Sequence, residues 1–186
     1  MCIEIIEINH EMNIELIKEF LFKQIKKEFN YDYIPEYHQD IVNLNDYYIS
    51  PKRNNFFISI DSKTKQIIGT IGIRGYDKSF EEFENIYSKE KTASVWRLFV
   101  DDNYRRCGLA TKLFKAVEKF SNENDYEEIY LHTHRNLNGA LEFWLKMGFK
   151  VTIDTNNELQ TIHMEKKLPK IKIKPQITHI DEAIKS

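Results

Sequence analysis

The spacing of hydrophobic residues changes several times along the chain, and each change predicts a new element. Residues 3–8 carry four isoleucines in a short run, which predicts a first β-strand. From residue 16 to residue 29, apolar side chains recur every three or four positions with lysines and glutamates between them, and this spacing predicts an amphipathic helix. Residues 31–48 are rich in tyrosine and acidic residues and are broken by Pro35, so we expect short helices and loops there.

The middle of the chain has the pattern of a β-hairpin. Residues 56–60 predict a strand, residues 61–65 a polar turn, and residues 66–74 the strand that returns. Residues 76–91 are charged and weakly patterned, and we expect a surface excursion there. Residues 94–100 again predict a strand.

The second half of the chain alternates between strand and helix periods. Apolar residues from 109 to 120 form a single helical stripe. Residues 129–133 predict a strand, and residues 139–146 predict a helix that Gly148 ends. Two final strands are expected at residues 149–153 and 161–166.

This order of elements predicts a mixed α/β sheet in a single domain, which we place at residues 1–168. Residues 169–186 contain two prolines and several lysines, and we interpret them as a C-terminal tail.

Composition and charge narrow the range of partners. The 186 residues carry 27 basic and 29 acidic side chains, so no global field favours nucleic acid or an anionic membrane. Two cysteines make no disulfide framework, and the first residues lack the pattern of a signal peptide. No apolar stretch approaches the length of a membrane helix. We therefore expect a cytoplasmic protein with no nucleic acid or membrane partner.

The strand-to-helix turn before residue 109 carries candidate chemistry. A strand ends near Val100 and a helix is expected to begin near Arg106, where the first backbone N–H groups have no internal partners. Phosphate oxygens accept hydrogen bonds from such groups. Gly108 lets the backbone approach a ligand, and Arg105 adds positive charge. The alternative interpretation is a helix that happens to start with two arginines and a glycine.

The sequence Arg105-Arg106-Cys107-Gly108-Leu109-Ala110 resembles the coenzyme A motif of the GNAT superfamily of N-acetyltransferases, R/Q-x-x-G-x-G/A. Residues 138–149 (NGALEFWLKMGF) resemble the second signature of that family. The resemblance implies a GNAT-like, mostly antiparallel central sheet that is splayed in the middle and flanked by helices. The splay would separate the strands near residues 94–100 and 127–133, leaving backbone groups for the pantetheine amides.

The resemblance also implies an activity. It implies transfer of an acetyl group from acetyl-coenzyme A to a primary amine, by direct attack in a ternary complex of a monomer or homodimer. A non-catalytic coenzyme A-binding or interaction module with the same fold remains an alternative. By position in the motifs, the residues implied in binding acetyl-coenzyme A are Leu98, Phe99, Val100, Arg105, Arg106, Cys107, Gly108, Leu109, Ala110, Thr111, Asn136 and Asn138.

The chain departs from the family pattern at the proton-transfer positions. Trp144 occupies the place where many relatives have a tyrosine acid, and we interpret it as a core aromatic. His132 stands where some relatives have a glutamate base, and a neutral histidine accepts a proton near neutral pH. Strand alternation puts His132 on one face with Tyr130, a candidate acid. His132 could instead merely line a cleft. Together with His134 and His163 it could suggest a metal, but no cysteine or paired carboxylate completes a set, so we expect none.

The acceptor is expected to bind near residues 31–48. In this segment Tyr37, Asp40 and Tyr47 are candidates, because a carboxylate attracts a cationic amine and tyrosine rings pack on it. The alternative is a solvated loop with a few tyrosines that hold it down.

Overall fold

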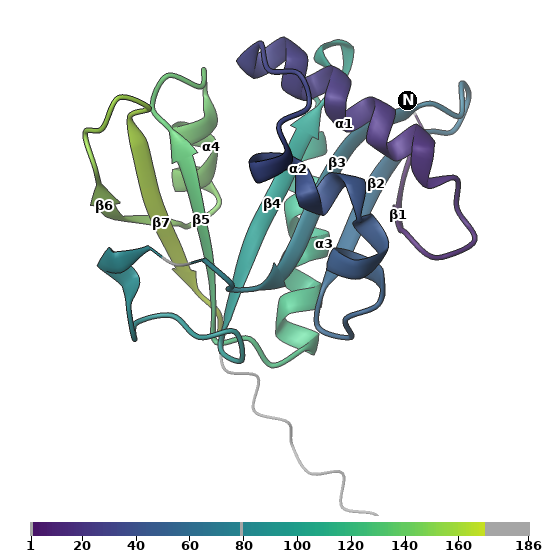
Figure 1. Ribbon diagram of the computed structural model, residues 1–186. Helices are drawn as coiled ribbons and strands as arrows, with labels where there is room; N and C mark the ends of the chain where they lie inside the picture. Colours follow the sequence, from purple (N-terminus) through teal and green to yellow (C-terminus); the bar gives the residue numbers. More distant parts are fainter. Residues whose placement is uncertain (1, 79, 170–186) are drawn as a thin grey trace, which may run out of the picture.

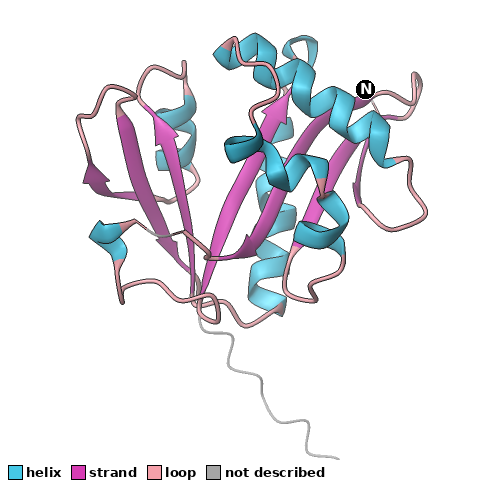
Figure 2. Ribbon diagram, in the orientation of Figure 1, coloured by secondary structure: helices cyan, strands magenta, loops and turns pink. Residues whose placement is uncertain are grey.

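The computed structural model describes residues 2–78 and 80–169, and the C-terminal tail expected at residues 169–186 lies outside them except for its first residue. Within these residues, a seven-stranded sheet has helices on both faces (Figures 1 and 2). The elements in chain order are β1 (Ile3–Glu7), α1 (Ile14–Phe29), α2 (Pro35–Val42), β2 (Asn55–Asp61), β3 (Ile67–Gly75), β4 (Thr92–Val100), α3 (Leu109–Glu123), β5 (Glu128–His134), α4 (Ala140–Lys146), β6 (Lys150–Asp154) and β7 (Thr161–Lys167).

The sheet has the order β1-β2-β3-β4-β5-β7-β6, and every neighbouring pair is antiparallel except β4 and β5. The predicted mixed, mostly antiparallel sheet is therefore confirmed. The parallel pair is very short: only Thr92, Ala93 and Ser94 of β4 pair with residues of β5. Beyond Ser94 the two strands diverge, as Figure 1 shows, and the sheet splits into two halves.

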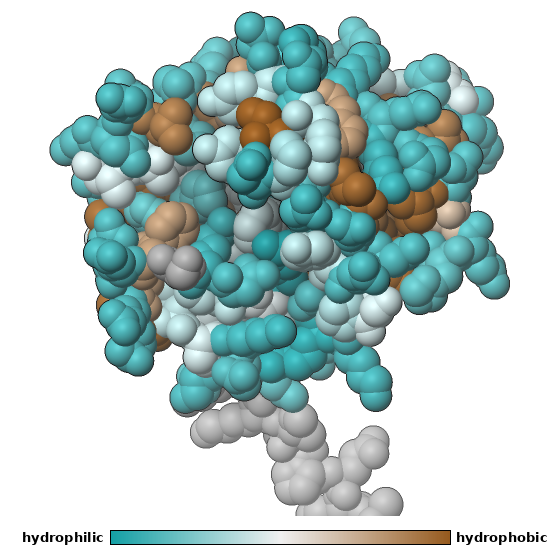
Figure 3. Space-filling model, in the orientation of Figure 1, coloured by the Kyte–Doolittle hydropathy of each residue, from teal (hydrophilic) through white to brown (hydrophobic). Residues whose placement is uncertain are grey.

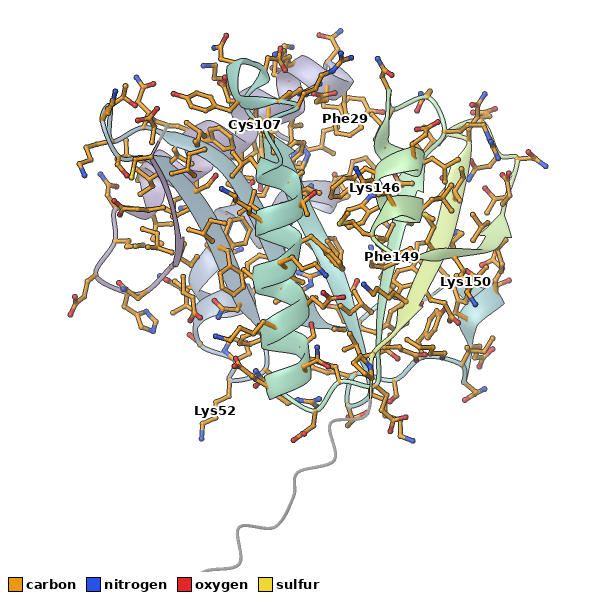
Figure 4. The ribbon with its side chains drawn as sticks, turned by 180° about the vertical axis from the view of Figure 1, so that it is seen from behind. Phe29, Lys52, Cys107, Lys146, Phe149 and Lys150 are labelled. Atoms are coloured by element: carbon orange, nitrogen blue, oxygen red, sulfur yellow. The ribbon has the colours of Figure 1, made fainter. Side chains whose placement is uncertain are left out.

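Helices cover the two faces of the sheet unequally. Helices α1 and α2 lie over β3 and β4 on one face, whereas α3 packs on β2, β3 and β4 from the other (Figures 1 and 4). Helix α4 packs on β5, on the same side as α3. None of the helices in residues 2–78 and 80–169 has the length and apolar character needed to cross a bilayer.

The largest apolar core joins the two halves beneath the split. It contains residues from β3, α3, β5, α4 and β7. At its centre the ring of Phe114 on α3 lies 5.6 Å from that of Trp144 and 5.4 Å from that of Phe149. Trp144 is only 6% exposed, which confirms its interpretation as a core aromatic.

The second core lies on the opposite face, where the tyrosine-rich segment packs. This segment forms α2 and a π-helical turn at Asn45–Ile49, so the expected short helices are confirmed. Ile41, Leu44 and Tyr48 bury their side chains against α1 and β2.

The segment after β3 is more ordered than its sequence pattern predicts. Tyr76, Phe83 and Tyr87 pack around Tyr130 of β5 and form a third core. The aromatic residues of this segment are spaced irregularly between charged ones. No helical or strand period therefore predicted that they would be buried. The expected surface excursion is instead a cover over the β5–β7 half.

The core beneath the split yields a stability prediction. Phe114→Ala removes a fully buried ring that connects α3 to α4 and should lower the free energy of unfolding by about 3–5 kcal/mol. Urea denaturation followed by circular dichroism measures this change. Leu145→Ala, at a side chain that is 48% exposed, is the control and should change stability by less than about 0.5 kcal/mol. Equal losses in the two variants would contradict the central role of Phe114.

Candidate active site

The turn before α3 exposes the start of that helix. The helix begins at Leu109, later than the expected start near Arg106, because Arg106 and Gly108 both have left-handed backbone angles with φ of 61° and 80°. Glycine adopts this conformation at low cost. A Cβ at position 108 would have no heavy atom within 4 Å, so the backbone there faces open space.

The first backbone N–H groups of α3 are available to a ligand. Helix geometry gives them no partner within the helix, and the Gly108 N-cap contributes no side-chain hydrogen bond. A pocket of about 280 Å³ lies against them. It is lined by Val100, Tyr104, Arg105, Arg106, Gly108, Leu109, Ala110, Thr111, Phe143 and Lys146.

The charges around this pocket are not equivalent. Arg105 is paired with Glu28 at the end of α1 and, at 3.0 Å, with Asp102. Arg106 and Lys146 have no ion pair among the described residues. The positive helix end and these two free cations therefore favour a ligand with negative charge, such as a pyrophosphate.

The pocket also contains residues that the sequence analysis did not assign. Tyr104, Phe143 and Lys146 line it, and Figure 4 shows Lys146 on α4 beside the helix that Cys107 precedes. Lys146 belongs to the second signature, but its sequence position does not reveal that α4 lies across from the start of α3.

Several predicted coenzyme residues lie around the pocket rather than in it. Leu98 packs against the core beneath the split, and Phe99 packs against the core on the opposite face. The exposed thiol of Cys107 donates to the carbonyl of Tyr104 at 2.7 Å. Exposed Asn136 and Asn138 do not line the pocket.

Neither Asn136 nor Asn138 caps α4. The N-cap residue is Gly139, with φ of 76° and no side-chain hydrogen bond to the helix. An L-residue is strained in this left-handed conformation, which places glycine rather than Asn136 or Asn138 at the start of the helix.

Strand β4 is irregular where it leaves β5. The register with β3 shifts between Thr70 and Gly72, and Arg97 opposite them has φ of 52°. The Thr70 hydroxyl donates to the Arg97 carbonyl at 2.8 Å and holds this bulge in place. The bulge lies beyond the last residue paired with β5, so the backbone of β4 borders the split from here to Val100.

The two faces of β5 are those that strand alternation predicts. Ile129 and Leu131 enter the core beneath the split, whereas Tyr130 and His132 point to the opposite face. The His132 ring lies 5.9 Å from the Phe80 ring and 6.1 Å from the His163 ring. His132 is thus a partly exposed side chain on the face of β5 opposite the core beneath the split.

Burial holds His132 in its neutral form. Burial is the largest cause of a pKa well below 6.5, and the positive charge of Lys78 lowers it further, as do smaller contributions from His134, His163 and Arg97. At neutral pH the imidazole is therefore an acceptor of protons rather than a donor.

The structure argues against Tyr130 as an acid. Its side chain has no exposed surface, and its hydroxyl shares a 2.7 Å hydrogen bond with Nδ1 of His163. Burial also raises the pKa of Tyr130 far above its ordinary value. The hydroxyl is thus held in the third core, away from a ligand.

Asp40 does not present a free negative charge. Its carboxylate is buried, accepts hydrogen bonds from the Arg97 guanidinium at 2.6 and 3.0 Å, and accepts another from the Tyr48 hydroxyl at 2.7 Å. Burial opposes ionisation, but Arg97 and Tyr48 outweigh it and lower the pKa of Asp40. The expectation that Asp40 attracts a cationic amine is not supported by this geometry.

The two predicted acceptor tyrosines have different surroundings. Tyr37 is 63% exposed, and its carbonyl accepts from Arg97. Tyr47 lies under the guanidinium of Arg74, with 4.9 Å between the guanidinium carbon and the ring centre. Tyr47 therefore lies beside a buried cation, at the edge of the second core.

Three histidines meet at the β5–β7 half. The rings of His132, His134 and His163 have centres about 6 Å apart between neighbours, at 5.9 and 6.1 Å. In residues 2–78 and 80–169, no three histidine, cysteine or acidic side chains are grouped closely enough to hold a metal ion.

Known proteins resemble this chain in sequence and in fold. Residues 18–149 match the model of the acetyltransferase (GNAT) family. Over 113 residues the chain is 26% identical to human N-acetyltransferase 8, an alignment that covers 61% of this chain and 46% of that protein. The chain thus spans about half the length of the curated relatives it matches.

Solved structures share the fold. A GNAT-family acetyltransferase from Staphylococcus aureus Mu50 superposes with a TM-score of 0.71 at 24% identity, covering 90% of this chain and 100% of that one. The PaiA N-acetyltransferase from Thermoplasma acidophilum, solved in complex with coenzyme A, superposes with a TM-score of 0.62 at 23% identity and covers 90% of this chain and 99% of that one.

The turn before α3 gives a prediction with a matched control. Gly108→Val places a branched side chain over the start of the helix and should abolish detectable binding of acetyl-coenzyme A in calorimetry. Gly139→Val is the control, because Gly139 has nearly the same φ and an equally open Cβ position but does not line the pocket. Both variants carry a similar backbone strain of about 1–2 kcal/mol. Normal binding by Gly108→Val would show that the ligand does not approach this turn.

Proposed function

The chain belongs to the acetyltransferase (GNAT) family, and on that premise we propose that it transfers an acetyl group from acetyl-coenzyme A to a primary amine. One observation carries this proposal above the others. The pocket at the start of α3 opens beside the stretch of β4 that has left β5. A phosphate-binding helix end and an unpaired strand edge are thus adjacent, as a ligand with a pyrophosphate and an amide-containing arm requires.

The residues that would hold acetyl-coenzyme A follow from this arrangement. The backbone N–H groups at the start of α3, with Arg106 and Lys146, suit the phosphates. The open backbone of β4 from Leu98 to Val100 suits the pantetheine amides. Acetyl-coenzyme A supplies the activated acetyl group as a thioester.

We propose direct transfer in a ternary complex. The amine nitrogen forms a bond to the carbonyl carbon while the carbon–sulfur bond breaks, and the sulfur leaves with the electron pair as a thiolate. The nitrogen must also lose a proton. Neutral His132, on the acceptor side of the split, is the proposed group that takes this proton. In this proposal the site mainly positions the two reactants.

A non-catalytic coenzyme A-binding module is the alternative. The observation that favours it is the lack of a tyrosine acid: Trp144 is buried in the core and the hydroxyl of Tyr130 is bonded to His163. A module of this kind would bind acetyl-coenzyme A through α3 but transfer nothing.

Binding and transfer can be measured separately. We expect calorimetry to detect acetyl-coenzyme A binding, and we expect thiol release to rise when a panel of primary amines is added. Mass spectrometry of the products identifies which amine gains 42 Da, the mass of an added acetyl group. Binding without transfer to any amine would support the module, and the absence of binding would reject both interpretations.

The proposed role of His132 predicts a pH effect with a definite sign. Because the pKa of His132 is held well below 6.5, its contribution to kcat/KM should be fully present at pH 7 and should decline only as the pH falls through that low pKa. His132→Gln should lower kcat/KM about 10²–10⁴-fold at pH 7. The ratio of wild-type to variant kcat/KM should then fall as the pH falls, since titration of the acceptor amine affects both proteins equally. A wild-type to variant ratio near one at pH 7, where neutral His132 should contribute fully, would remove His132 as the base.

A further inference from the structure

A group of cations lies on the acceptor face of the sheet, beside the bulge in β4. Arg74 at the end of β3 places its guanidinium carbon 3.7 Å from the centre of the Trp96 ring. The Lys78 ammonium lies 3.7 Å from the same ring centre. Arg97 follows Trp96 in sequence, with its guanidinium carbon 5.9 Å from that ring. Three cationic side chains therefore surround one indole.

The carboxylates nearby do not cancel this charge. Asp40 neutralises Arg97 through two hydrogen bonds. Asp77 contacts Arg74 at 3.3 Å, a long contact, and its side chain is 38% exposed. Lys78 has no ion pair among the residues that the structure describes. Two carboxylates thus contact the three cations around this indole, and Lys78 is left without one among the described residues.

Arg74 has unused hydrogen-bonding capacity. The residue is only 6% exposed, yet its Nε and Nη1 atoms have no hydrogen-bond partner within the described residues. A buried charged group is costly when it is left without partners. Nε1 of Trp96 and Oγ of Ser94 are also buried without a hydrogen-bond partner among the described residues. Ser94 is the residue that pairs with Arg74 across the strands.

The unpaired groups have one property in common, since each of them is a hydrogen-bond donor. Guanidinium and indole nitrogens only donate, and the serine hydroxyl can donate. The four unpaired donors on Arg74, Trp96 and Ser94 therefore favour a ligand group that accepts hydrogen bonds and donates none. A carboxylate fits, because its two oxygens accept several hydrogen bonds and match the planar guanidinium.

We propose that the acceptor amine carries a carboxylate close to its nitrogen, and that Arg74, with Lys78, recognises this carboxylate over the indole of Trp96. The inference rests on the proposed function, because it names the substrate class of the same site. The subsite lies next to the split along β4: Trp96 directly precedes the bulge at Arg97, beyond which β4 borders the split. The carboxylate subsite and the stretch of β4 proposed to bind the pantetheine arm are thus neighbours along one strand.

The same cations disfavour other amines. A polyamine or a simple cationic amine would enter a region of like charge, which repels it. Positive surroundings also favour the neutral, nucleophilic form of a bound amine. Figure 3 shows that the face carrying α1 and α2 is mostly hydrophilic, with apolar residues in small separate patches, which suits a polar acceptor.

The test uses pairs of amines that differ only by the carboxylate. The three pairs are L-tyrosine and tyramine, L-histidine and histamine, and L-ornithine and putrescine. We expect kcat/KM to be at least roughly tenfold higher for the carboxylated member of a pair that reacts. A further arm compares the tripeptides Met-Glu-Leu and Met-Gln-Leu, which separates a free amino acid from an acidic peptide N-terminus as the source of the carboxylate.

Arg74→Gln removes the guanidinium charge while it retains a polar side chain. It should reduce the preference for carboxylated amines about tenfold or more, mainly through KM, and leave acetyl-coenzyme A binding in calorimetry unchanged. Arg53→Gln is the matched control. Arg53 also lies over an aromatic ring, that of Tyr126 at 4.2 Å, but its guanidinium is satisfied by the carbonyls of Asn124 and Glu90. This control should keep the wild-type preference.

The outcomes separate this inference from the proposed function. Acetylation of tyramine, histamine or putrescine as fast as of the carboxylated partner would overturn the carboxylate subsite and leave the N-acetyltransferase intact. If no amine reacts, the transferase proposal fails, and the subsite is then tested by calorimetry alone. In the presence of coenzyme A, N-acetyl-L-tyrosine should bind to the wild type more tightly than N-acetyltyramine and lose this advantage in Arg74→Gln. Equal binding of the two compounds would overturn the subsite.

Discussion

The divergence of β4 and β5 is the constraint on which the rest of the structure depends. Only three residues of β4 pair with β5, so backbone hydrogen bonds connect the two halves of the sheet over a very short distance. Apolar packing beneath the split also joins the halves, where Phe114 on α3 lies against Trp144 and Phe149. The Lys166 ammonium on β7 pairs with the Glu118 carboxylate on α3. This packing leaves the strand edge of β4 open and places the start of α3 beside it. The pocket at the start of α3 and the exposed edge of β4 are both consequences of that one separation.

Much of the fold and part of the site could be predicted from the sequence, because both depend on local patterns. The alternation along β5 assigned His132 to the correct face, and the glycine at position 108 marked the turn before α3, which has a left-handed backbone in the structure. What the sequence did not show depends on contacts between distant segments. The aromatic residues around Tyr130 come from a segment without any regular period. Lys146 joins the pocket only because α4 packs beside α3.

Asp40 illustrates why local composition is a weak guide to the electrostatics of a site. An acidic, tyrosine-rich segment suggested a pocket for a cation. In the folded chain, Asp40 and Tyr48 are buried. The Asp40 carboxylate accepts hydrogen bonds from the Tyr48 hydroxyl and from the Arg97 guanidinium. The field on this face is then set by side chains from β3 and the loop after it, which are more than 30 positions away in the sequence. Pairing thus removes the free negative charge expected of Asp40, and residue counts do not reveal such a pairing.

The positions of the two tryptophans have a spectroscopic consequence. Trp144 lies in the apolar core on the α3–α4 side, whereas Trp96 lies on the other face between cationic side chains. Indole emission depends on the polarity and charge around the ring, so the two residues form separate intrinsic fluorophores. The emission of Trp144 reports the integrity of the packing that joins the two halves of the sheet. The emission of Trp96 reports the charge environment where the acceptor is expected to enter, and a single-tryptophan variant at either position would let the two events be followed without an added label.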